Sequence, residues 1–211
     1  VVDKVHAYGG LVYHDVTERK WAEIGVDCGV DGLICVNNRA GGHCGRLSAE
    51  QLYDDCQSLA RPLVCAGGIS DHAGLTRMLE IGYQACQLGT RFIATNECKV
   101  SERYKQAIIG ASEQDIVLTE KMTGVPVSII RSSCRSVQSY KADGLLAWLL
   151  ESSRLKHLTR LLLSLRSIAS LKSAIKSTSS SSEYWQAGKS VAGIDRVLSV
   201  QQVVQRLMGK V

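Results

Sequence analysis

A glycine-rich loop that contains one histidine follows a short apolar run near the start of the chain. The run Gly32-Leu33-Ile34-Cys35-Val36 leads into Ala40-Gly41-Gly42-His43-Cys44-Gly45. Glycines allow backbone amides to approach a ligand closely, and the proton affinity of histidine suits general-base chemistry near neutral pH. The pattern therefore makes His43 a candidate acid/base residue beside a bound ligand.

Two further apolar runs end in glycine loops. Residues 62–66 lead into Gly67-Gly68, and residues 85–88 lead into Gly89-Thr90. Backbone N–H groups in such loops, together with the positive end of a following helix, can cradle a phosphate. We therefore predict a phosphate site at these two loops, with His43 facing the same opening.

The elements that position these loops have the rhythm of a parallel α/β fold. Each apolar run is short and continuous, as in strands that are buried on both faces. Helix-like stretches cover residues 18–28, 48–60 and 71–81, so strand starts recur every ~20–30 residues. The sequence predicts an α/β fold of the parallel (β/α) TIM-barrel type, in which chemistry gathers at the carboxyl ends of the strands. Any other parallel α/β domain is the alternative.

Several segments of the chain, in their order, resemble the nitronate monooxygenases, formerly called 2-nitropropane dioxygenases. The resemblance covers about residues 1–130 and 183–205. The matching segments are His14-Asp15-Val16-Thr17, Gly29-Val30-Asp31-Gly32-Leu33, Ala40-Gly41-Gly42-His43, Ala66-Gly67-Gly68-Ile69, Gln87 to Thr95, Thr123-Gly124-Val125 and Tyr184 to Val191.

The resemblance implies an FMN-dependent TIM-barrel enzyme that oxidises alkyl nitronates or nitroalkanes with dioxygen to a carbonyl compound and nitrite. It makes His43 the general base. The residues that match flavin and phosphate contacts are Gly41, Gly42, Gly67, Gly68, Gln87, Leu88, Gly89 and Thr90. The family often has a glutamine at the position of Val36, so the substrate is less well indicated than the cofactor.

Residues 10–17 have the same apolar-then-polar shape as the three runs above, so four strands are predicted, and they correspond to the second half of a barrel. We divide the chain into a C-terminal half-barrel over 1–133, a helical insertion over 134–182 and a segment over 183–211 that packs back on the barrel. Four strands cannot close a barrel alone. We therefore expect either a fragment, inactive by itself, or a chain that associates with itself or with a complementary half-barrel.

The insertion is strongly basic. Nine Lys or Arg and two acidic residues lie between Arg131 and Lys176, where apolar residues recur at helical spacing. Such amphipathic helices can contact anionic membranes or nucleic acid. We favour a helical cover over the barrel mouth, followed by a serine-rich linker at 177–182. We expect no nucleic-acid partner and no stable membrane insertion.

The eight cysteines do not indicate a disulfide framework or a metal site. The chain has no C-x-x-C pair, and Cys35, Cys65 and Cys86 lie within apolar runs, where a free cysteine behaves as a small hydrophobe. Hydrophobic residues make up 45% of the chain and charged residues 21%, which is ordinary for a globular protein. We expect a cytoplasmic protein.

Two other functions remain open. An FMN-dependent enoyl reductase of fatty-acid synthesis shares the Gly-Gly-His loop and would require NAD(P)H. A non-catalytic half-barrel that binds a phosphate or a partner through the basic helices is the second alternative.

Overall fold

The computed structural model describes residues 1–120, 125–131 and 185–210, together with residues 144, 148, 149, 152, 157, 159–163 and 165. The predicted motif at Thr123-Gly124, most of the insertion and the serine tract lie outside the described residues. The division into three segments therefore stays a prediction. Across the described part of the chain, no helix is long and apolar enough to cross a membrane.

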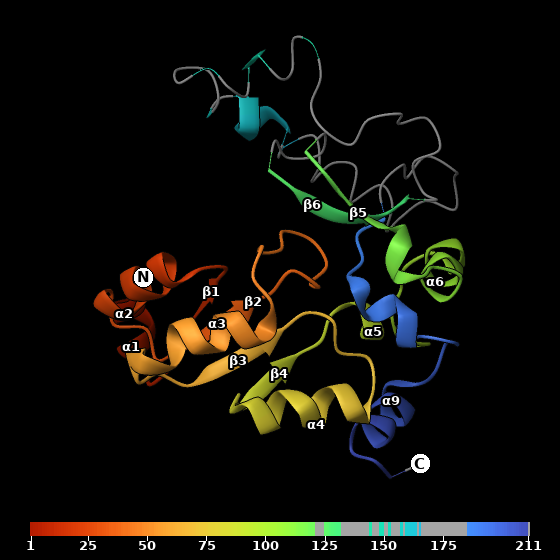
Figure 1. The fold of residues 1–211 in the computed structure, drawn as a ribbon, viewed down its shortest axis with the longest axis horizontal. Helices are drawn as coiled ribbons and strands as arrows, with labels where there is room; N and C mark the ends of the chain where they lie inside the picture. Colours follow the sequence, from red (N-terminus) through yellow and green to blue (C-terminus); the bar gives the residue numbers. More distant parts are fainter. Residues whose placement is uncertain are drawn as a thin grey trace.

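Four short strands form a parallel sheet in the order β1-β2-β3-β4 (Figure 1). They are β1 (Tyr13–Val16), β2 (Gly32–Val36), β3 (Leu63–Ala66) and β4 (Ala85–Gln87). The apolar runs predicted all four strands. Their carboxyl ends meet at one edge of the sheet because the strands are parallel. Among the described residues, β1 and β4 are the outer strands of this sheet.

Three helices return the chain between consecutive strands, and a fourth precedes them. They are α1 (Val2–His6), α2 (Arg19–Asp27), α3 (Ala49–Cys56, continued by η1, Gln57–Leu59) and α4 (His72–Ile81). Ser48 forms a capping box with Gln51, and the Asp71 carboxylate accepts from the Gly74 amide at 2.8 Å. These caps satisfy backbone donors that would otherwise lack partners at the start of each helix.

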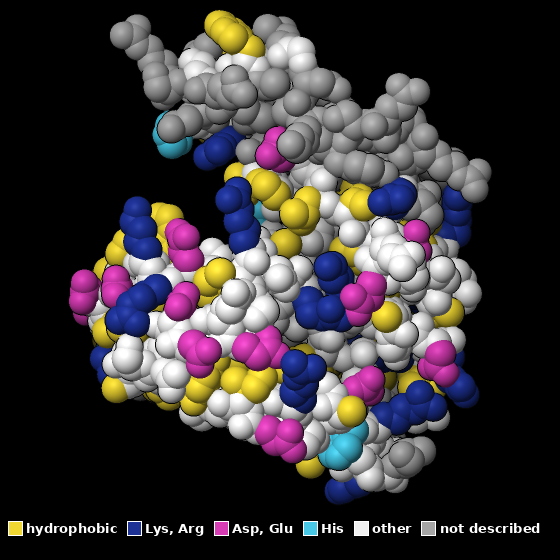
Figure 2. Space-filling view, in the orientation of Figure 1, with side chains coloured by type: hydrophobic (Ala, Val, Ile, Leu, Met, Phe, Trp, Pro, Cys, Tyr) yellow, Lys and Arg dark blue, Asp and Glu magenta, His cyan; other side chains and the backbone are white. Residues whose placement is uncertain are grey.

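The main core lies between this sheet and its helices. Leu33, Leu52 and Leu63 are almost fully buried in it, and each contributes about 1.5–3 kcal/mol relative to an exposed side chain. Cys35 and Cys65 are buried in the same core, as predicted. On the face shown in Figure 2, basic and acidic side chains of the described residues are interspersed.

A second unit follows β4. It contains α5 (Thr90–Ile93), α6 (Glu102–Ile109), η2 (Glu113–Asp115) and an antiparallel pair of strands, β5 (Ile116–Thr119) and β6 (Val127–Ile130). Its core contains the buried side chains of Ala94, Ile108 and Ile130.

The last described segment packs on both units. It includes η4 (Lys189–Gly193) and α9 (Val200–Leu207), and α9 lies beside α4 (Figure 1). The Nδ1 atom of His72 lies 2.9 Å from the carbonyl oxygen of Leu207, and Trp185 stacks on Tyr104 with 5.8 Å between ring centroids. Residues 185–210 therefore return to α4 and α6, which lie far earlier in the chain.

Candidate functional site

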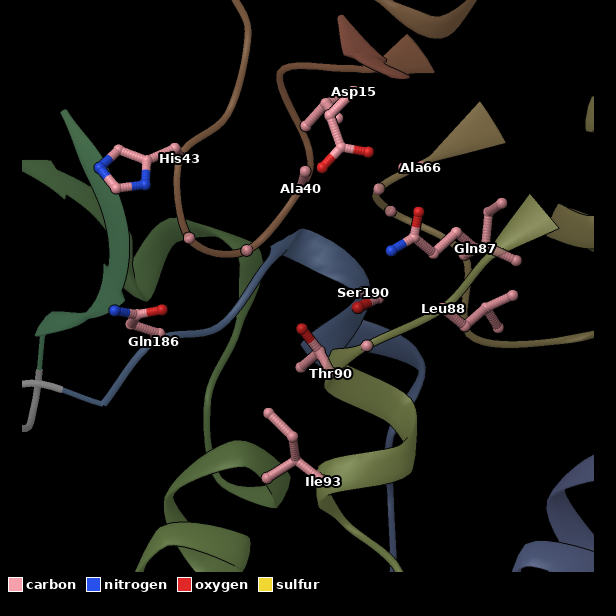
Figure 3. Close-up of a pocket in the computed structure, with 17 residues that line it drawn as sticks. Asp15, Ala40, His43, Ala66, Gln87, Leu88, Thr90, Ile93, Gln186 and Ser190 are labelled. Atoms are coloured by element: carbon pink, nitrogen blue, oxygen red, sulfur yellow. The ribbon is translucent and has the colours of Figure 1, made fainter. Parts of the chain in front are cut away.

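A cavity of about 420 Å³ lies at the carboxyl ends of the four parallel strands (Figure 3). All nine residues singled out from the sequence line this one cavity. They are Gly41, Gly42, His43, Gly67, Gly68, Gln87, Leu88, Gly89 and Thr90. Its volume falls within the ~300–1,000 Å³ of small-molecule sites. The structure therefore brings the predicted residues together from three successive strand ends.

The conformation of the loop after β3 depends on its two glycines. Gly67 and Gly68 have φ of +116° and +81°, in the region that other residues rarely adopt. A Cβ on Gly67 would also lie 2.5 Å from the side-chain oxygen of Asn37. The amide of Asn37, itself 1% exposed, donates to the carbonyl of Gly67 at 3.0 Å and accepts from the backbone N–H of Arg39 at 2.8 Å. Asn37 therefore ties the β2 and β3 loops together.

The His43 loop is held from its other side by the C-terminal segment. The backbone of Gly188 approaches Gly41 so closely that a Cβ on Gly41 would lie 2.8 Å from the Gly188 nitrogen. The Gly188 N–H donates to the hydroxyl of Thr90 at 3.0 Å. The hydroxyl oxygen of Thr90 thus acts as an acceptor within the protein, which leaves its O–H to donate elsewhere.

His43 lies at the rim of the cavity. On one side of it, the carbonyl of Gly42 accepts from the Ser128 N–H at 2.8 Å, and on the other the Cys44 sulfur accepts from the Ser128 hydroxyl at 3.3 Å. Figure 3 shows the imidazole pointing away from Asp15 and Gln87, toward β6. Although the residue is exposed, surrounding atoms displace enough water to lower the pKa of His43 below its usual 6.5.

The sequence did not single out three polar residues of the cavity wall. Asp15 enters from β1, and Gln186 and Ser190 enter from the segment around η4 (Figure 3). The adjacent His14 lies against α2 instead, where a Cβ on Gly25 would meet its ring at 2.8 Å. Alternate residues of a strand point to opposite faces, so strand alternation was the signal for Asp15.

Ionisable groups are scarce in the cavity. Among the described residues that line it, only Asp15 and His43 can titrate, and no Lys or Arg contributes. Arg91 follows the glycine loop of β4 but is buried outside the lining, where its guanidinium donates to the carbonyls of Ala94 and Arg196 at 3.2 and 3.1 Å. Among the described residues, no group of three His, Cys, Asp or Glu side chains is placed to hold a metal ion.

Comparisons with known proteins identify relatives of this chain. A family model described as "Nitronate monooxygenase" matches residues 1–210. The nitronate monooxygenase of Paraburkholderia phytofirmans is 32% identical over 125 residues, which are 54% of this chain and 33% of that protein. The chain therefore spans about a third of the length of this curated relative.

Solved structures share the fold. FabK of Thermotoga maritima superposes with a TM-score of 0.80 at 23% identity, covering 99% of this chain and 63% of that one. A nitroalkane oxidase of Streptomyces ansochromogenes gives a TM-score of 0.72 at 22% identity, covering 99% and 59%. These similarities show a parallel (β/α) fold of the TIM-barrel type, as the sequence predicted.

Proposed function

Because the chain belongs to the nitronate monooxygenase family of oxidoreductases, we propose that its cavity binds FMN and serves the oxidation of alkyl nitronates by dioxygen. The products are a carbonyl compound and nitrite. The observation that supports this proposal most directly is the gathering of three glycine loops and His43 around one cavity. When bound, FMN supplies the acceptor for the electrons of the nitronate.

The residues present suit a phosphorylated cofactor. A Cβ on Gly89 would meet nothing within 4 Å, so the loop after β4 borders open space instead of packed protein. The Thr90 hydroxyl retains its donor, and the Ser190 side chain lies close by in Figure 3. Since no Lys or Arg is among the described residues of the lining, backbone N–H groups and hydroxyls are the groups that would hold the phosphate there.

His43 is the residue that we propose for proton transfer. The α-proton of a nitroalkane moves from the carbon that bears the nitro group to the neutral imidazole, and the negative charge left behind spreads onto the nitro oxygens. The lowered pKa of His43 keeps the ring neutral and able to accept this proton at pH 7. A general base of this kind contributes typically ~10²–10⁴-fold to the rate. A preformed nitronate has already lost the proton and does not require this step.

A complete site needs more strands than the described sheet provides. β1 and β4 have unpaired outer edges among the described residues, and a barrel closes only when strand number and shear agree. We propose that a complementary half-barrel or a second copy of the chain supplies the remaining strands. By itself the chain then holds the phosphate loops and His43 without a closed substrate pocket.

The first test is the visible spectrum of the desalted protein, reconstituted with FMN and titrated anaerobically with propyl-2-nitronate. A bound-flavin spectrum that bleaches on addition of nitronate supports the proposed reaction. Faster bleaching by NADPH than by nitronate would instead identify an enoyl reductase. Failure to retain FMN, combined with salt-sensitive binding to anionic lipid or nucleic acid, would indicate a non-catalytic binding module.

A further inference from the structure

The cavity has different chemistry at its two ends. Asp15 provides the one carboxylate among the described residues that line it. Figure 3 shows this carboxylate directed toward Ala40 and Ala66, while the hydroxyls of Thr90 and Ser190 lie on the other side of the cavity. A ligand that reaches across the cavity therefore meets an acceptor with full negative charge at one end and hydroxyl donors at the other.

The sheet itself fixes the position of Asp15. β1 pairs with β2 so that Asp15 lies opposite Ile34, and Ile34 lies opposite Val64 in turn. The cross-strand neighbours of the carboxylate on this face of the sheet are therefore aliphatic. His14 and Val16, on either side in the strand, are directed to the opposite face. A residue on a strand is held more rigidly than one on a loop, which suits it to orient a ligand.

The Asp15 carboxylate is also available to a ligand. The side chain is exposed, and no described residue forms a hydrogen bond or an ion pair with it. By contrast, the carboxylate of Asp31 accepts from the Val12 amide at 2.6 Å and contacts His6 at 2.9 Å, and that of Asp71 caps α4. Those two acids have structural partners, whereas Asp15 has none among the described residues and lines the cavity.

We propose that Asp15 is a positioning residue that fixes the orientation of the cofactor. Its carboxylate repels the phosphate, which therefore lies at the Thr90–Ser190 end, and it accepts a hydrogen bond from an N–H of the uncharged ring system. The choice of FMN as ligand rests on the proposed function. The inference that is specific to this chain is the role of Asp15.

Binding of FMN and of riboflavin to the full chain separates the two ends of the ligand. Asp15→Ala removes an acceptor that both flavins would use, so we expect both dissociation constants to rise by a similar factor, about tenfold or more. Thr90→Val removes a donor to the phosphate, so we expect FMN to bind more weakly while riboflavin is unaffected. Asp27→Asn changes an exposed acid of α2 outside the lining and should leave both unchanged.

The midpoint potential of the bound flavin provides a second readout that a merely structural role would not move. Reduction adds negative charge to the ring, so neutralising a nearby carboxylate in Asp15→Asn should raise the potential. Thermal unfolding of Asp15→Asn and Asp15→Ala at the wild-type temperature would show that the fold is intact. Asp15→Asn gives the comparison of charge alone, because the amide oxygen can still accept a hydrogen bond.

The outcomes are distinct. If Asp15→Ala tightens FMN without affecting riboflavin, the phosphate lies beside Asp15 and the orientation that we propose is reversed. If neither dissociation constant nor the midpoint potential changes, Asp15 does not contact the cofactor, although FMN binding stands. If the wild-type chain binds neither flavin, the proposed cofactor fails and the role of Asp15 fails with it.

Discussion

Gly41 and Gly188 pack backbone against backbone, and neither position has room for a side chain. A Cβ on Gly188 would lie 2.6 Å from the nitrogen of Gly41, and a Cβ on Gly41 would lie 2.8 Å from the nitrogen of Gly188. The Lys189 N–H adds a 2.9 Å hydrogen bond to the carbonyl of Arg39. The loop that presents His43 is thus held by a segment near the opposite end of the sequence.

Replacing Gly188 by alanine should destabilise this contact. The added methyl group meets backbone atoms of residues 39–41, which cannot move aside as a flexible side chain would. We expect Gly188→Ala to lower the free energy of unfolding by about 1–3 kcal/mol, the usual cost of overpacking. Urea denaturation measures this. Gly110→Ala, whose Cβ would lie 3.4 Å from its nearest neighbour, is the matched control. Equal midpoints for the two variants would contradict the prediction.

Gly89→Ala should behave in the opposite way. Its φ of −108° is ordinary for alanine, and the new methyl group meets no protein atom within 4 Å. We therefore expect wild-type stability but weaker FMN binding, because the methyl group projects into the space assigned to the cofactor. Quenching of flavin fluorescence measures the affinity. An unchanged affinity for FMN would place the phosphate elsewhere.

Asn37 and the adjacent Asn38 provide a matched pair for testing the link between the β2 and β3 loops. Asn37 is buried and satisfies the Gly67 carbonyl and the Arg39 N–H, whereas Asn38 is exposed and makes a long 3.4 Å contact with the Arg46 carbonyl. We expect Asn37→Ala to cost about 1–3 kcal/mol of stability and Asn38→Ala almost nothing. Thermal or urea unfolding compares them, and similar losses would remove the special role of Asn37.

His43→Asn should separate proton transfer from cofactor binding. In an active, complete form we expect FMN to remain bound and kcat/KM for a neutral nitroalkane to fall by about 10²-fold or more. Turnover of the preformed nitronate should fall much less, because it needs no base. Stopped-flow flavin reduction with both substrates gives the ratio. An equal loss on both would argue against His43 as the base.

The pH dependence follows from the direction of the His43 pKa. The imidazole must be neutral to accept a proton, so activity toward a nitroalkane is lost as pH falls through its pKa. Desolvation lowers that pKa below 6.5, so the loss should begin only on the acid side of 6.5 and the rate should be level around pH 7. A plot of kcat/KM for a nitroalkane against pH shows this loss on the acid side, and the plot for His43→Asn should lack it. A midpoint above 6.5 would contradict the prediction.

Local sequence signals were enough to predict the strands of the parallel sheet and the loops that follow them. The apolar runs gave β2 and β3 almost to the residue, and the glycines after β3 and β4 marked the cavity because their neighbours along the chain form its wall. The helix-like stretch over 71–81 matches α4, whose first turn is capped by the Asp71 carboxylate.

Elements that depend on contacts between residues far apart in the sequence could not be predicted from local signals. The β5–β6 pair was not predicted, because its short strands are stabilised by each other and by the backbone of Gly42 and Gln186. Gln186 and Ser190 reach the cavity through long-range contacts of their segment with Gly41, Thr90 and β6. Nothing in their local sequence specifies that they line the cavity.

The contact between Gly41 and Gly188 also determines the order in which parts of the site can form during translation. Gly41 leaves the ribosome long before Gly188, so the parallel sheet can form first while the cavity still lacks the wall that Gln186 and Ser190 provide. Closing so long a loop is slow, because much conformational entropy is lost before the contact forms. Each doubling of the loop length nevertheless adds only about 0.6 kcal/mol to the free-energy cost of closure. Extra residues between the two glycines can therefore be accommodated with little loss of stability, and the cavity wall is complete only after Gly188 and Ser190 have been translated.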